Sequence, residues 1–140
     1  MEKALKFLKD CSVFYLATND GDQPRVRPFG AVCGFEGKLY IITNNQKKVF
    51  DQMQKNQELE ISGMAGGKWI RLSGEAVRDT RREAKVAMLE ANPSLGGMYN
   101  ADDGIMEVLY LKNAQASICS FTDAPETWSF SRVQTRHNHS

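Results

Sequence analysis

Three glycine-containing turn sequences constrain the fold of this chain most, because each one separates two short runs of strand-forming residues. The turns lie at residues 19–22, 34–37 and 66–67. In the first of them, Asp20-Gly21 supplies the positive φ that a tight β-hairpin requires. Short apolar runs joined by such turns are typical of antiparallel sheets, so we predict a sheet built largely from hairpins.

The apolar pattern between the turns predicts about seven strands. They span residues 12–18, 25–33, 38–43, 58–64, 68–78, 105–111 and 115–121. The first three, with their two short loops, are expected to form a meander. The fifth alternates clearly, with Trp69, Arg71 and Ser73 on one face and Ile70 and Leu72 on the other.

Three short helices are predicted at residues 2–10, 46–55 and 80–91. Asn44 or Asn45 is expected to cap the second helix, and Thr80 with Glu83 forms a capping-box pattern at the start of the third. Residues 92–104 contain glycines, a proline and aspartates and are predicted to be a loop. Two to three peripheral helices around an antiparallel sheet give an α+β fold with a small β-barrel.

The chain length of 140 residues is typical of one domain that can bury a core without a disulfide or a metal. We expect a single domain over residues 1–122. The polar segment 123–140 is expected to be a partly disordered tail, above all at residues 134–140.

Charge and cysteine content exclude several classes of protein. The formal net charge of +1 argues against broad electrostatic capture of nucleic acid or of an anionic membrane. Cys11, Cys33 and Cys119 are far apart and form no CxxC pair, which favours free thiols in a reducing cytoplasm.

Met1-Glu2-Lys3 is not followed by a long apolar run, and no run approaches the length of a membrane span, so a cytoplasmic location is expected. No metal site is predicted, because His137 and His139 lie in the expected tail.

Two basic sequences form a candidate anion site. Arg25 and Arg27 lie two residues apart on one face of a predicted strand, and Lys47-Lys48 opens a predicted helix after the next hairpin. Lysines at a helix start oppose the helix dipole, a cost that is explained if an anion lies between them and the first-turn N–H groups. The pattern predicts a ligand that carries a phosphate group.

The alternative is that both arginines are surface residues paired with Asp20, Asp22 or Glu36. We favour this alternative for Arg25. It is weaker for Arg27, because Pro28 and Phe29 follow at once and the middle of the strand should be buried.

The order and spacing of these sequences resemble the pyridoxamine-phosphate-oxidase-like split barrels that bind FMN, in particular their small, single-domain, nitroimidazole-reductase-like group. The matching pieces are Gly21 to Pro28, the hairpin at 34–37, Leu39 to Thr43, Lys47-Lys48, Leu59 to Met64 and Trp69 to Val77. The resemblance covers about residues 5–121. It implies an antiparallel split β-barrel with two to three peripheral helices, FMN as the cofactor, and a homodimer with FMN at the subunit interface.

The resemblance also assigns roles to residues around FMN. It implies that Arg27, Lys47 and Lys48 hold the phosphate. The backbone of Pro28, Phe29 and Gly30 would run along the flavin ring, and Thr43, with Ile42 beside it, would hydrogen-bond the flavin. Trp69 would approach the ring from the partner subunit, where an indole would stack on the ring or cover it.

The sequence departs from the oxidase pattern in three places. The segment between Thr43 and Lys48 is one residue shorter, and Gln46 stands where a serine is common. The arginine-proline-tryptophan-glycine pattern that serves pyridoxal phosphate is absent, because Trp128 has no such neighbours. Oxidation of pyridoxamine phosphate is therefore not expected.

Three functions remain open at the level of the sequence. The first is an FMN-dependent oxidoreductase that reduces a small electron-deficient substrate, for example a nitroaromatic. The second is a non-catalytic FMN-binding protein or electron carrier. The third is a small barrel that binds single-stranded nucleic acid, against which the near-zero net charge counts.

Met98 and Tyr99 could line a pocket, although a glycine-rich loop with one tyrosine is more often only a loop.

Overall fold

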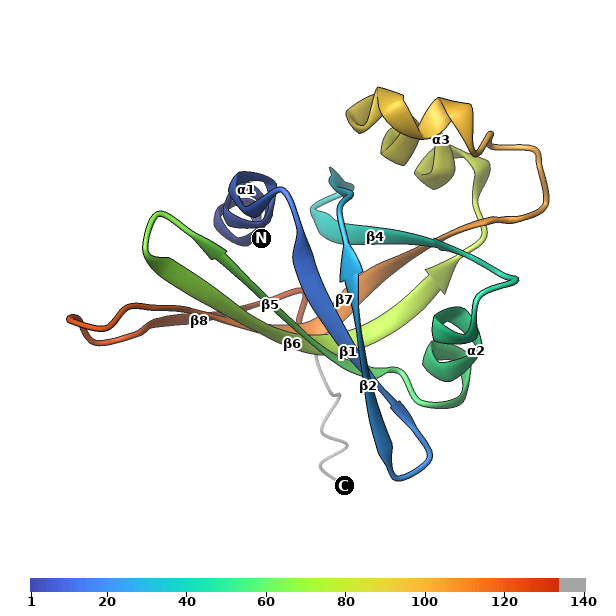
Figure 1. Cartoon of the computed structure of the whole chain (residues 1–140). Coiled ribbons are helices and arrows are strands. Elements are labelled where there is room, and N and C mark those ends of the chain that lie inside the picture. The colour runs from blue at the N-terminus through green and yellow to red at the C-terminus, as the bar shows by residue number, and fades with distance from the viewer. Residues whose placement is uncertain (134–140) are drawn as a thin grey trace, which may run out of the picture.

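A computed structural model of the chain describes residues 1–133, which form one antiparallel sheet of eight strands with three α-helices and a 3₁₀ helix (Figure 1). The strands are β1 Phe14–Asp20, β2 Gln23–Phe29, β3 Val32–Phe35, β4 Lys38–Asn44, β5 Glu58–Ala65, β6 Lys68–Asp79, β7 Met106–Cys119 and β8 Glu126–Phe130. The helices are α1 Glu2–Cys11, α2 Lys48–Lys55, α3 Arg82–Ala91 and the 3₁₀ helix η1 Pro93–Gly97. The predicted class, an α+β split barrel with peripheral helices, is confirmed.

The strand order is β2-β1-β5-β6-β7-β4-β3, with β8 added on β7. The predicted meander of the first three strands is therefore wrong. Residues 25–33 break at Gly30 and Ala31 into β2 and β3, which lie at opposite ends of the strand order. The break occurs where β1 begins: Phe14 is the last partner of β2, and Ser12, with φ of 62°, has already turned the chain out of α1.

The two last predicted strands are one continuous strand, β7. The gap between the two predicted strands, residues 112–114, contains Asn113, whose φ of 51° accompanies an irregularity in the pairing with β6 between Ser73 and Glu75. This irregularity is a β-bulge, and the strand continues through it. Gly74 lies at this bulge, and a Cβ on it would be 3.3 Å from the carbonyl oxygen of Lys112.

Strand β8 lies in the segment that was expected to be a tail. It pairs with β7, with Trp128 opposite Ala116, and its aromatic residues pack against the core. The domain boundary at residue 122 stays a prediction, and the disorder expected for residues 134–140 lies outside the described residues.

The barrel interior is closed by the helices. Ala4 and Leu8 of α1 and Val49 and Met53 of α2 are buried in the main apolar core, whereas α3 packs mainly against β3 and β7. The predicted caps of the second and third helices are wrong.

Helix α2 begins at Lys48, two residues later than predicted, with Lys47 at the N-cap. The side chain of Asn44 instead accepts a hydrogen bond from the backbone N–H of Gln46 at 3.1 Å. Helix α3 begins at Arg82, so Thr80 caps nothing; the carboxylate of Asp79 accepts the N–H of Arg81, the N-cap residue, at 3.0 Å. Within residues 1–133, no helix is both long and apolar enough to cross a membrane.

Candidate functional site

A cavity of about 350 Å³ lies where the β2–β3 junction, the end of β4, the start of α2 and the segment from α3 to Tyr99 meet. It is lined by Pro28, Phe29, Gly30, Ala31, Ile42, Thr43, Lys47, Asn92, Ser94, Leu95, Met98 and Tyr99. Six of the residues predicted from the sequence are thus brought together around one cavity: Pro28, Phe29, Gly30, Ile42, Thr43 and Lys47. The strand break is responsible, because it turns the backbone of residues 28–31 toward the end of β4.

Thr43 places an unsatisfied hydroxyl group in the wall of this cavity. The residue is 4% exposed, and its Oγ1 is a buried side-chain atom without a hydrogen-bond partner in residues 1–133. Nearly all buried polar groups in native proteins are paired, and an unpaired one costs about 1–3 kcal/mol. The hydroxyl therefore fits a ligand that offers it a polar atom.

Lys47 brings a positive charge to the same cavity. Both Lys47 and Lys48 are exposed at the N-terminus of α2, and neither forms an ion pair within the described residues. Asp51, in the first turn of the helix, pairs with Lys55 at 3.0 Å and leaves the lysines uncompensated. Two cations beside first-turn N–H groups favour binding of an anion.

Arg27 lies near this helix but does not line the cavity. Its Nη1 donates to Thr18 Oγ1 at 2.7 Å and its Nη2 donates to Gln52 Oε1 at 2.8 Å, so the guanidinium joins β2 to β1 and α2. Burial, together with repulsion from Arg25, lowers the pKa of Arg27. Arg25 itself is exposed and pairs with Asp20 at 3.4 Å, as expected for a surface arginine.

Trp69 also lies outside the cavity of its own chain. It occupies the outer face of β6 opposite Met64 and Cys119, and its ring packs against Phe121 with centroids 5.0 Å apart. Lys48 likewise does not line the cavity, although it follows Lys47 directly.

The segment from α3 to Tyr99 forms a wall of the cavity. The sequence predicts a loop here in which Met98 and Tyr99 could line a pocket, and both residues do line the cavity. Asn44 Nδ2 donates to the hydroxyl of Tyr99 at 2.8 Å, and Asn92 Nδ2 donates to the carbonyl oxygen of Val32 at 3.0 Å. These bonds join residues that are 55 and 60 positions apart, and the only signal in the sequence was an aromatic residue in a glycine-rich segment.

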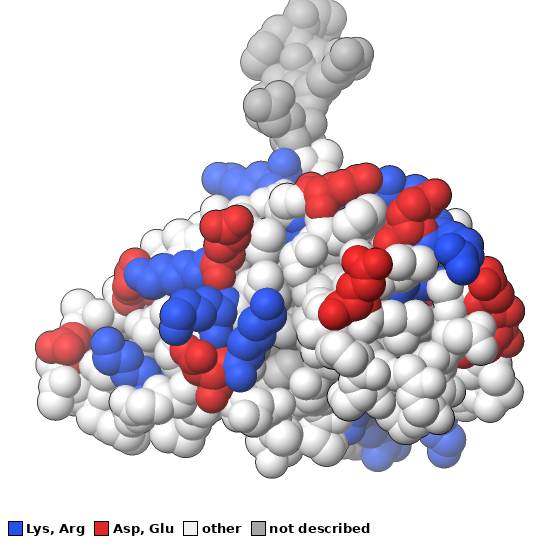
Figure 2. All heavy atoms as spheres, turned by 90° about the horizontal axis from the view of Figure 1, so that it is seen from above, with Lys and Arg blue, Asp and Glu red and all other residues white. Residues whose placement is uncertain are grey.

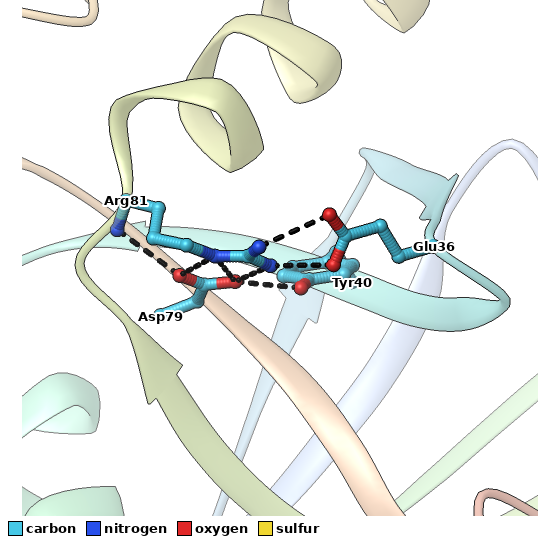
Figure 3. A network of polar contacts seen from close by, with 4 residues as sticks. All are labelled: Glu36, Tyr40, Asp79 and Arg81. Atoms are coloured by element: carbon cyan, nitrogen blue, oxygen red, sulfur yellow. Dashed lines mark hydrogen bonds and ion pairs between the residues drawn. The ribbon is translucent and has the colours of Figure 1, made fainter.

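A network of polar contacts fixes the start of α3, and hence this wall (Figure 3). Arg81 donates to both oxygens of Glu36 at 3.0 and 2.8 Å and to Asp79 at 2.9 Å, while the hydroxyl of Tyr40 donates to Asp79 at 2.7 Å. Burial disfavours the charged form of Asp79, but the hydrogen bonds from Arg81 and Tyr40 outweigh it and lower the pKa of Asp79 to about 2. The network ties the β3–β4 hairpin to the end of β6.

One larger hollow of the surface fits an anionic ligand less well. A larger hollow of about 500 Å³ lies over β1, β5 and β6, and its lining includes Glu58, Glu60 and Glu75, which would repel a phosphate. Acidic and basic side chains intermingle over the face shown in Figure 2, so this face offers no continuous basic track for nucleic acid. His137 and His139 lie outside the described residues.

Comparison with known proteins places the chain in a family. The family model described as pyridoxamine 5'-phosphate oxidase matches residues 1–129. The chain belongs to this family. A crystal structure of a NimC/NimA family protein from Clostridium acetobutylicum is 60% identical, with a TM-score of 0.90 and 93% of each chain covered.

Two solved structures of lower identity share the fold. General Stress Protein 26 from Bacillus anthracis is 17% identical, with a TM-score of 0.73 over 92% of this chain and 97% of that one. A pyridoxamine 5'-phosphate oxidase-related, FMN-binding protein from Nostoc punctiforme is 14% identical, with a TM-score of 0.60 over 92% and 93%. No curated protein matches the sequence.

Proposed function

We propose that this protein binds FMN in the cavity beside Thr43 and uses it to reduce a small electron-deficient molecule, such as a nitroaromatic. The observation that carries the proposal is the unpartnered, buried hydroxyl of Thr43 in a cavity that also contains Lys47. Family membership and the Nostoc punctiforme neighbour, which is described as FMN-binding, support the choice of cofactor.

The lining of the cavity suits a flat ring with polar edges. Phe29, Ile42 and Leu95 are apolar, and Gly30 is a position where the backbone can approach a ligand because no Cβ intervenes. Thr43 would offer its hydroxyl to a polar atom of the ring. The cavity of about 350 Å³ is within the range of about 300–1,000 Å³ that is common for small-molecule sites, and Arg27 and Lys48 lie outside its lining.

The phosphate of FMN would lie near the start of α2. Lys47 and Lys48 would neutralise its charge there, the first-turn N–H groups would donate to its oxygens, and Arg27 would approach it from β2. An anion at this place would also relieve the unfavourable position of two lysines at the positive end of the helix.

When bound, FMN supplies the redox chemistry, and the protein has to bind and orient it. Lys47 and Tyr99 are the titratable side chains in the cavity lining, which is consistent with a reaction that needs no acid–base pair from the chain. The NimC/NimA family relative is compatible with a nitroaromatic substrate. The same scarcity of titratable groups favours a second candidate function, an FMN-binding electron carrier without a substrate of its own.

We further propose that the protein is a cytoplasmic homodimer in which the second subunit completes the flavin site. The exposed apolar side chains of Val26, Met64 and Phe121 support the dimer, because such side chains are typical of protein interfaces. Cys11, Cys33 and Cys119 are all free thiols, which suits a reducing compartment. Burial raises the pKa of Cys33 to about 11, so this thiol is poorly reactive.

Titration with FMN and with riboflavin tests the proposed cofactor. Binding to the protein should quench the fluorescence of micromolar FMN, and the bound FMN should raise the melting temperature of the protein. Arg27→Ala should remove a charge-assisted contact of about 1.5–3 kcal/mol. This loss corresponds to about tenfold to hundredfold weaker FMN binding. Riboflavin, which lacks the phosphate, should bind Arg27→Ala and the unaltered protein alike; equal losses for both flavins would mean that Arg27 supports the fold.

Electron transfer distinguishes the two candidate functions. The FMN-loaded protein, reduced with dithionite under anaerobic conditions, should be reoxidised by a nitroaromatic compound or a quinone. If neither acceptor reoxidises it, the carrier function replaces the reductase.

A further inference from the structure

The guanidinium of Arg27 is held at one end and open along one edge. Thr18 Oγ1 accepts from Nη1 at 2.7 Å, and Gln52 Oε1 accepts from Nη2 at 2.8 Å. These two acceptors are themselves joined by a hydrogen bond of 2.6 Å from Thr18 to Gln52, so together they fill the end of the guanidinium formed by its two Nη groups. The side edge, made of Nε–H and the other N–H of Nη2, has no partner within residues 1–133.

Other arginines of this chain show what that edge binds. Arg78 uses Nε and Nη2 to donate to the two oxygens of Glu107 at 2.8 and 2.9 Å. Arg82 uses the same two nitrogens to donate to Asp102 at 2.8 and 3.0 Å. The edge is a two-pronged donor that matches two oxygens of a carboxylate or a phosphate, and in Arg27 it is available.

The groups that hold Arg27 are buried and neutral. Thr18 is 2% exposed and Gln52 is 7% exposed, and Arg27 forms no ion pair within the described residues. Its remaining contacts, from Nη1 to the carbonyl oxygens of Leu16 and Arg25, are also to neutral acceptors. The positive charge is thus fixed in place without being cancelled.

Gln52 connects this arginine to the helix that carries the lysines. It belongs to α2, whose N-cap is Lys47. A glutamate at position 52 could accept the same two hydrogen bonds, but its charge would pair with Arg27 and compete with a ligand anion. A neutral amide at this position orients the guanidinium and leaves its charge for the ligand.

We propose that Thr18 and Gln52 are positioning residues, which hold Arg27 so that its open edge meets two oxygens of the FMN phosphate. This inference rests on the proposed FMN site and adds to it the pair of side chains that orient the phosphate-binding arginine. It also gives a reason for a neutral residue at position 52.

Three variants test it by their preference for FMN over riboflavin. Gln52→Glu keeps the acceptors and cancels the charge, and it should weaken FMN binding by about tenfold or more. Thr18→Val removes one of the two acceptors, and it should weaken FMN binding by about threefold to tenfold. Riboflavin affinity should stay the same in both. Gln54→Glu is the matched control: it makes the same charge change at an exposed position of α2, and it should alter FMN affinity by less than about threefold.

The readouts separate positioning from structural support, and this inference from the proposed cofactor. Melting curves establish that each variant folds, and Thr18→Val carries the test if Gln52→Glu does not fold. Equal losses of FMN and riboflavin affinity, or an unchanged preference in the folded variants, would overturn the positioning role while FMN binding stands. An unaltered protein that binds neither flavin, or both equally well, would overturn the phosphate site and this inference with it.

Discussion

At the scale of single residues, Thr43 and Thr18 can be compared directly. Both are threonines almost fully removed from solvent, on strands that face the interior. The hydroxyl of Thr18 is bonded to Gln52 and Arg27, whereas that of Thr43 has no partner in residues 1–133. The same substitution by valine should therefore have opposite effects on stability at the two positions.

We predict that Thr43→Val raises the free energy of unfolding of the ligand-free protein by about 1 kcal/mol, because it removes a buried group without a bond. It should also weaken FMN binding by about twofold to tenfold, which is the loss of one neutral hydrogen bond. Thr18→Val, as the matched control, should lower the free energy of unfolding. Urea unfolding without flavin measures the first effect, and a titration measures the second. A Thr43→Val protein that is less stable and binds FMN normally would remove the evidence for a ligand at this hydroxyl.

The residue scale also shows what the sequence could and could not predict about the site. Some residues of the cavity belong to short motifs that are local in the chain, and a family resemblance predicts that they share one site. These are residues 28–30, Thr43 and Lys47. Asn92 and Tyr99 are held in the wall of the cavity by side-chain hydrogen bonds to residues more than 50 positions away. Contacts of that kind depend on packing and leave no periodic pattern in the sequence.

At the scale of elements, the wrong bounds predicted for residues 25–33 and 105–121 share one cause. Residues 25–33 look like one strand and residues 105–121 look like two, yet the first breaks and the second continues. A strand ends where its partner ends: β2 stops opposite Phe14, and β7 continues because β6 is long enough to pair with it on both sides of the bulge. Propensity predicts that a segment is extended, but the pairing decides its bounds.

The contact that fixes the start of α3 gives a prediction about acid stability. Asp79 has a pKa of about 2 in the folded protein and an ordinary value of 3.8. The network therefore contributes its full stabilisation above about pH 4, and this contribution falls as the pH drops through the folded pKa. A shift of this size corresponds to about 2 kcal/mol.

Urea unfolding at several pH values between 2 and 7 would measure this contribution. Asp79→Asn should be less stable than the unaltered protein at pH 7, and the difference should shrink toward pH 2. Asp102→Asn is the matched control, because Asp102 also accepts two bonds from an arginine but lies at the surface, with a side chain that is 68% exposed. A difference between Asp79→Asn and the unaltered protein that does not change with pH would contradict the assigned role of the charge.

At the scale of the whole molecule, several large apolar side chains are exposed on the outer face of the sheet, beside the ion pair of Arg71 and Glu60. Tyr15, Val26, Met64 and Phe121 are 53–85% exposed, and Val26 lies opposite Ala17 while Met64 lies opposite Trp69 on that face. Exposed apolar side chains gathered on one face are typical of a protein interface. We predict a dimeric mass in light scattering; a monomeric protein that still binds FMN tightly would contradict a site shared between subunits.

Trp69 connects this face to the flavin. Its ring packs on Phe121 on the outer face of β6, outside the cavity of its own chain, and we propose that it reaches the flavin from a partner subunit. We predict that Trp69→Ala changes the absorption spectrum of bound FMN and the rate of nitroaromatic reduction while the dimer persists, and that Trp69→Phe, which keeps an aromatic ring, changes both less.

The alternative role of Trp69 is to pack the dimer interface, and the order of events on dilution distinguishes the two roles. If Trp69 covers the flavin ring, the spectrum of Trp69→Ala differs from that of the unaltered protein at every concentration at which both are dimers. If it only packs the interface, the spectra are the same until the variant dissociates, and they diverge at that concentration. Trp128→Ala is the matched control, because Trp128 packs against the core from β8. Its truncation should lower the melting temperature and leave the flavin spectrum of the folded dimer unchanged, so a spectral change in Trp69→Ala alone assigns the indole to the flavin.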